Sequence, residues 1–160
     1  MRKIAWVCTL VTVLLMTSSC GLLNGLFHKT SYLEVVEERL GLSLDEAKVL
    51  EEWDTHGGFH GDGEAFVKVS VSDGFEGDLG LVEIAEGKFD DGWYALPLMG
   101  TAYEYFYEWG GLFEHPETGE RLIPEVENGY WKMTGSAPQN WEIVILDTDA
   151  DTLYYYEYDS

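Results

Sequence analysis

Residues 54–64, DTHGGFHGDGE, contain the side chains whose types and spacing are best suited to chemistry. His56 and His60 lie four residues apart, and Asp54 and Asp62 flank them. Neutral imidazole and carboxylate groups are good ligands for zinc and related divalent metals, and four glycines allow the loop to fold tightly enough to gather them. These residues are therefore a candidate divalent-metal site. A structural glycine loop, with side chains bonded to its own backbone, is the interpretation that the sequence favours.

Aromatic side chains form a second candidate for binding. Exposed tyrosine and tryptophan rings stack on sugars and pack against protein partners. Trp93, Tyr130 and Trp131 are the candidates for such a surface, with a protein or a carbohydrate as its partner. Packing of the same rings in the core of a small sheet is the default interpretation.

The charge balance excludes one class of partner. The 160-residue chain has 30 acidic and 9 basic residues, a formal net charge of -21, and such a field repels the phosphates of nucleic acids. The G-x-S-x-G elbow, the P-loop and the dinucleotide fingerprint of common enzyme classes do not occur in the sequence. We therefore expect a binding or interaction module rather than an enzyme. The alternative is a metal-binding module or metal-dependent enzyme centred on the loop of His56 and His60.

The N-terminal segment has the order of an export signal. Arg2 and Lys3 precede an apolar run at residues 4–16, which is shorter than the ~20 residues that span a bilayer. Small residues at positions 17–19 then lead to Cys20. This order resembles the signal peptide of a bacterial lipoprotein.

The resemblance implies that residues 1–19 are removed and that Cys20 becomes the new N-terminus, carrying acyl chains such as palmitate. Residues 20–31 would then tether the rest of the chain to the extracytoplasmic face of the cell membrane, within the cell envelope. Two acyl chains give stable anchoring, where a single chain binds a membrane only marginally. Without lipidation of Cys20 the protein would be secreted.

Residues 32–160 are predicted to form a single acidic domain. Apolar residues recur with helical spacing at residues 32–40. The segments predicted as strands by alternation or by β-rich composition are residues 65–72, 129–134, 141–147 and 153–158. Residues 141–147 are apolar on both faces, which indicates an interior strand.

Three further segments are less regular. We expect a short helix at residues 78–86. Residues 47–54 fit neither the helical nor the strand period, and the glycine loop that follows favours a strand there. Residues 101–109 fit either period. The fold class that these elements predict is α+β: an antiparallel sheet of about five strands with two or three short helices on one side.

Three stretches of the domain resemble a known family. They are DTHGGFHGDG at residues 54–63, IPEVENGYW at residues 123–131 and DTDADTLYYYEYD at residues 147–159. Together they resemble a family of small uncharacterised proteins from Gram-positive gut bacteria, over residues 47–158. The resemblance implies one domain, and it implies no particular activity or cofactor.

Overall fold

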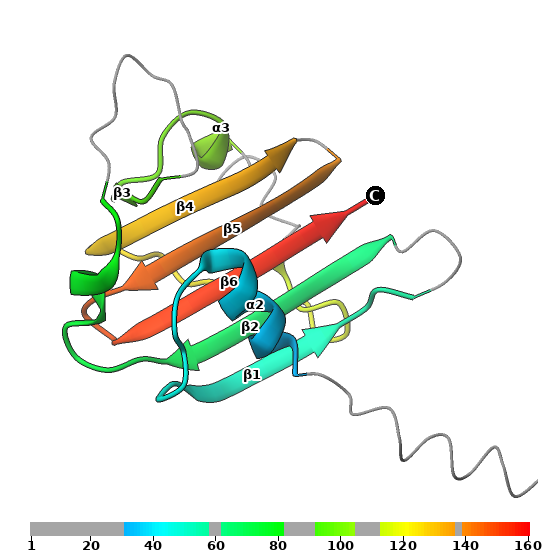
Figure 1. Ribbon diagram of the computed structural model, residues 1–160. Coiled ribbons are helices and arrows are strands. Elements are labelled where there is room, and N and C mark those ends of the chain that lie inside the picture. The colour runs from blue at the N-terminus through cyan, green and yellow to red at the C-terminus, as the bar shows by residue number, and fades with distance from the viewer. Residues whose placement is uncertain (1–30, 58–61, 82–91, 105–112, 137–138) are drawn as a thin grey trace, which may run out of the picture. The chain divides into compact units, whose positions relative to one another are not determined.

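A six-stranded sheet forms the centre of the structure (Figure 1). The structure is a computed structural model that describes residues 31–57, 62–81, 92–104, 113–136 and 139–160. All neighbouring strands are antiparallel. The predicted antiparallel sheet is therefore confirmed, although the described ranges hold six strands where about five were expected. In order across the sheet the strands are β1 (Lys48–Asp54), β2 (Gly63–Ser70), β6 (Thr152–Asp159), β5 (Asn140–Asp147), β4 (Gly129–Ser136) and β3 (Tyr94–Ala95).

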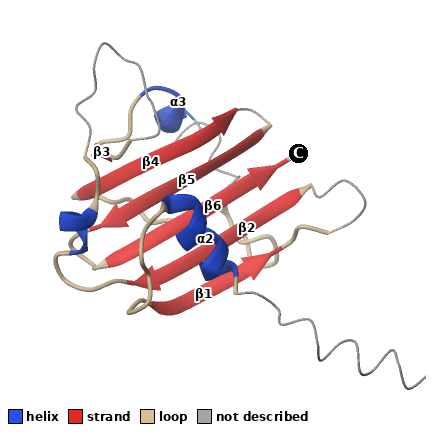
Figure 2. Cartoon of the chain, in the orientation of Figure 1, coloured by secondary structure: helices blue, strands red, loops and turns tan. Residues whose placement is uncertain are grey.

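Helical segments lie on both faces of the sheet, not on one side as expected (Figure 2). Helix α2 (Tyr32–Leu40), which the sequence predicted, packs on one face together with the 3-10 turn η1 (Phe75–Asp78). The single turn α3 (Gly100–Tyr103) packs through Ala102 on the other face. The expected two or three helices on one side are thus wrong, because only α2 exceeds about one turn in the described ranges. None of these described helices is long and apolar enough to cross a membrane.

The segment with no clear period is edge strand β1. Its register against β2 shifts between Val49 and Glu51, so Leu50 is an extra residue in the ladder. A bulge of this kind reverses the face on which the following side chains lie. This reversal explains why neither period is clean in the sequence, although the expected strand is present.

The sheet lies between two hydrophobic layers, one on each face. Strand β5 contributes to both layers, as predicted: Ile143 and Ile145 face one layer, whereas Val144 and Leu146 face the other. The layer beneath α2 consists mainly of aliphatic side chains, including Val36, Leu40, Val67, Val69, Val144, Leu146 and Leu153. The opposite layer is rich in aromatic rings, including Phe66, Tyr94, Phe113, Trp131, Trp141 and Tyr156.

The short helix expected at residues 78–86 is not formed in its described part. Turn η1 ends at Asp78, Leu79 is extended and buried, and Leu81 forms an isolated bridge with Trp93. Gly80 also disfavours a helix, by about 1 kcal/mol relative to alanine. The remainder of this segment lies outside the described residues, as does most of the segment at 101–109, which begins with α3.

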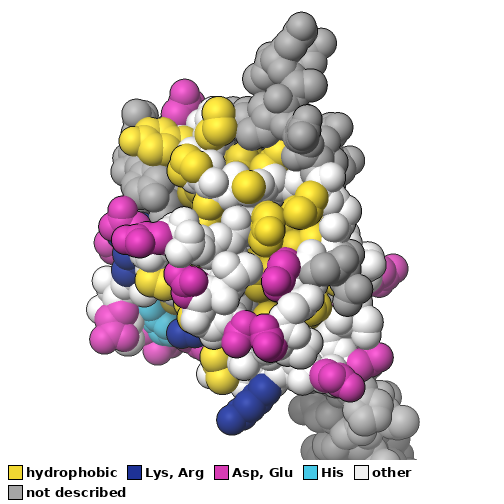
Figure 3. Space-filling view, turned by 90° about the vertical axis from the view of Figure 1, so that its left-hand side faces the viewer, with side chains coloured by type: hydrophobic (Ala, Val, Ile, Leu, Met, Phe, Trp, Pro, Cys, Tyr) yellow, Lys and Arg dark blue, Asp and Glu magenta, His cyan; other side chains and the backbone are white. Residues whose placement is uncertain are grey.

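Acidic side chains are dispersed over one face of the described domain. On the face shown in Figure 3, Asp and Glu lie scattered among hydrophobic and uncharged groups. Dispersal keeps like charges apart, so a net charge of -21 is compatible with a folded sheet. A place where several carboxylates converge is therefore a candidate for a functional site.

Candidate metal site

The residues that follow β1 and those that begin β2 fix the position of His56. The Thr55 N–H donates to the Glu64 carbonyl at 2.8 Å, and the Glu64 N–H donates to Thr55 Oγ1 at 2.8 Å. Gly63 lies so close that a Cβ there would come within 2.7 Å of the His56 backbone. The glycine therefore permits the close approach that places His56 at the end of the sheet.

Asp54 sets the orientation of the His56 ring. One oxygen of its carboxylate, Oδ1, accepts the His56 backbone N–H at 2.8 Å and lies 2.7 Å from ring Nδ1. The ring stacks on Tyr32, with 6.4 Å between centroids and an interplanar angle of 4°. A carboxylate bonded to Nδ1 holds the proton there and leaves Nε2 with its lone pair, the form in which histidine binds a metal.

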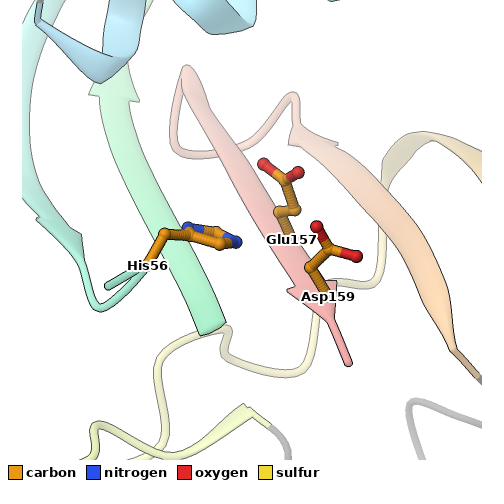
Figure 4. A group of neighbouring side chains, drawn as sticks. All are labelled: His56, Glu157 and Asp159. Atoms are coloured by element: carbon orange, nitrogen blue, oxygen red, sulfur yellow. The ribbon is translucent and has the colours of Figure 1, made fainter. Parts of the chain in front are cut away.

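The Nε2 atom of His56 is buried and has no hydrogen-bond partner among the described residues. It points toward two carboxylates on β6, those of Glu157 and Asp159 (Figure 4). One ligand atom from each of these three residues lies within 4.8 Å of the other two. A buried ring nitrogen without a partner is costly, and an ion between these atoms would satisfy it.

The arrangement depends on the pairing of β2 with β6. Alternate residues of a strand share a face, so Glu157 and Asp159 point to the same side as Tyr155. Their partners on β2 are Ala65 and Gly63. Small residues at both positions leave the space between the turn after β1 and the β6 carboxylates free of large side chains.

Glu157 is the centre of a hydrogen-bond network beneath α2. Arg39 Nη1 lies 2.5 Å from Glu157 Oε1, and the Tyr32 hydroxyl donates to Oε2. The Tyr155 hydroxyl lies 3.2 Å from the same Oε2 atom. Burial disfavours ionisation of Glu157, but the hydrogen bonds from Arg39 and Tyr32 outweigh it, so its pKa lies below the usual value. Glu157 is therefore a buried, ionised carboxylate.

Glu142 on β5 extends the network to a second carboxylate. It accepts a hydrogen bond from the Tyr155 hydroxyl at 2.5 Å and another from the Thr134 hydroxyl. Arg39 lies 3.3 Å from Glu142 and donates to the Tyr155 hydroxyl at 2.9 Å. Burial, strengthened by the charge of Glu142, raises the pKa of Tyr155. The hydroxyl therefore stays protonated and acts as a donor.

Two hollows border the carboxylates of β6. One, of about 290 Å³, is lined by Arg39, Thr134, Glu142, Glu157 and Asp159 among others. The second, of about 500 Å³, is bordered by Asp62, Glu64 and Asp159. Asp159 is thus accessible from both hollows, so an ion bound to it is not sealed from solvent.

The structure brings together part of the predicted metal set. Asp54 and His56 form one unit, whereas Asp62 is exposed and is not part of the cluster that His56 forms with β6. His60 and Cys20 lie outside the described residues.

The three aromatic residues expected at a binding surface lie mainly in the two hydrophobic layers. Trp93 and Trp131 are 4% and 1% exposed. Tyr130 is partly buried against the layer beneath α2. This placement corresponds to the core-packing interpretation of these rings.

Glu157 and Asp159 were not identified from the sequence. The sequence did contain an indication of Glu157. The predicted strand at residues 153–158 places Tyr155 and Glu157 on one face of the sheet, and the structure shows that Tyr155 is buried on that face. A carboxylate on a buried face needs a partner. The partner is Arg39, far away in the sequence, and the nearness of His56 requires the pairing of β2 with β6.

Comparisons with models of known protein families, with curated proteins and with solved structures found no match for the chain.

Proposed function

We propose that this domain binds a divalent transition-metal ion, with zinc as its best representative, through His56, Glu157 and Asp159. The observation that carries the proposal is the buried His56 Nε2, which has no hydrogen-bond partner among the described residues and faces two carboxylates. Asp54 supports it as the carboxylate that orients the ring from the opposite nitrogen, an arrangement common among metal-bound histidines.

The donor set favours zinc over calcium. Imidazole suits zinc and its neighbours, whereas calcium takes six to eight oxygen ligands. Bonds of ~2.0–2.2 Å to a tetrahedral ion place ligand atoms about 3.4 Å apart. The present spacing of up to 4.8 Å requires only small side-chain adjustments. Three protein ligands leave the fourth position for water or a small molecule.

The His56→Ala variant should bind zinc more than about 100-fold more weakly than the wild type, because it loses the one nitrogen ligand. The measurement is competition for zinc with a chromophoric chelator, using the full chain purified in detergent. Asp54→Asn should weaken binding by about 10–100-fold, since it removes the carboxylate that orients the ring.

The matched control is His115→Ala. His115 lies beside Trp53, and its Nδ1 accepts hydrogen bonds from backbone N–H groups of its own turn. Its replacement should leave zinc affinity unchanged. Equal affinity of the wild type and His56→Ala would refute the proposal.

We also propose that the chain is anchored at the extracytoplasmic face of the cell membrane through lipidated Cys20. The support is the order of residues at the N-terminus: Arg2 and Lys3, the apolar run at residues 4–16, and small residues before the cysteine. The domain would then bind its ion within the envelope.

Cells that express the wild type in the presence of labelled palmitate should yield a labelled protein in the membrane fraction. Cys20→Ala should abolish the label and release the protein, because no other residue offers a thiol at the cleavage site. Cys8→Ala is the control and should keep the label, since Cys8 leaves with the signal peptide. A Cys20→Ala protein that still carries the label would contradict the anchor.

A further inference from the structure

Both ends of helix α2 make polar contacts with the same carboxylate. Tyr32, the first residue of the helix, donates to Glu157 Oε2. Arg39, in the last turn, lies 2.5 Å from Glu157 Oε1. These two contacts, named here the Glu157 latch, connect the helix to β6 across the sheet.

The latch shares two of its components with the proposed metal site. Glu157 is a ligand in that site, and Tyr32 also stacks on the His56 ring. An ion bound by Glu157 would lie near the Arg39 guanidinium, whose Nη1 is 2.5 Å from Glu157 Oε1, and two positive charges on one carboxylate repel each other. The ion and Arg39 therefore cannot both hold Glu157 at full strength.

We propose, on the basis of the proposed metal-binding function, that zinc and helix α2 compete for Glu157. Binding of the ion loosens the polar contacts of α2, and the latch in turn lowers the affinity for the ion. This reciprocity is a thermodynamic requirement for any two interactions that share one group.

Binding of the ion would weaken only the polar contacts of α2, those of Tyr32 and Arg39 with Glu157. Val36 and Leu40 stay packed in the layer beneath the helix, and the Tyr32 N–H keeps its 2.7 Å hydrogen bond to Glu52. The helix consequently becomes more mobile but stays packed on the sheet. Because α2 directly follows the segment at residues 20–31, the response occurs at the junction between the domain and its proposed tether.

The test measures zinc affinity and hydrogen exchange on the full chain in detergent. Arg39→Gln should bind zinc about ten-fold or more tightly than the wild type, because the competing charge is gone. Tyr32→Phe keeps the stacked ring but loses the hydroxyl, and should shift affinity in the same direction by less. Lys48→Gln, which removes an exposed positive charge on β1, is the control and should have no effect.

The second readout needs no variant. In the wild type, backbone amides of residues 33–40 should exchange faster when zinc is added, while those of β5 should not. Equal affinity of the wild type, Arg39→Gln and Tyr32→Phe, or unchanged exchange in α2 on zinc binding, would overturn the latch and leave the metal site standing. Failure of all these proteins to bind zinc would overturn the proposed function, and the latch with it.

Discussion

A chain that lacks residues 153–160 will yield no soluble folded domain. These residues supply nearly all of β6, which lies between β2 and β5 in the middle of the sheet. Their removal takes four buried side chains from the two layers, those of Leu153, Tyr154, Tyr155 and Tyr156. Burial of each such side chain stabilises by about 1.5–3 kcal/mol, so the loss is comparable to the whole stability of a typical domain, about 5–15 kcal/mol.

The deletion also leaves the inner edges of β2 and β5 without partners, and exposed edges favour aggregation. The measurement is the soluble fraction after expression, followed by thermal melting. Deletion of Ser160 alone is the control, since that residue is exposed and follows the strand. A chain without residues 153–160 that is soluble and melts cooperatively near the wild-type temperature would contradict the observed strand order.

Gly129→Ala will destabilise the domain by about 2–6 kcal/mol. Gly129 begins β4 with φ near +150°, a conformation that side chains disfavour, and a Cβ there would lie 1.8 Å from the Leu146 carbonyl oxygen. The contact is with backbone of the paired strand β5, which cannot move aside without breaking the ladder. We expect the melting temperature to fall by roughly 10–20 °C.

Gly80→Ala is the matched control for this substitution. A Cβ at Gly80 meets no atom within 4 Å, so the change in stability should stay within about 0.5 kcal/mol. If both variants melt together with the wild type, then the start of β4 is looser than the structure shows.

The sequence predicts the local elements where a single period dominates. Helix α2 has the bounds that its apolar spacing predicted, and β5 and β6 lie where strands were predicted at residues 141–147 and 153–158. The extra residue in β1 could not be placed, because a bulge depends on how one strand lies against another. The strand order could not be predicted either, since pairing of the first hairpin with the last strand is a long-range choice with no local signature.

The candidate site illustrates the same limit. Residue type and a glycine-rich turn pointed to His56 and Asp54, and the structure places them together. The remaining groups come from β6, and only the register that sets Gly63 opposite Asp159 brings them near. Asp62 was selected for its closeness in sequence, but it is exposed and is not part of the group formed by His56, Glu157 and Asp159.

The pairing of β2 with β6 also determines when the domain can fold. It joins residues 63–70 to residues 152–159. Closing so long a loop is slow, because the chain loses conformational entropy before the stabilising contacts between the two strands form. During synthesis β1 and β2 are made first, and they lack the central strand β6 until residues 152–159 are made. A chain exported by the proposed signal peptide would thus remain unfolded during translocation, and its sheet would close only after residues 152–159 had crossed the membrane.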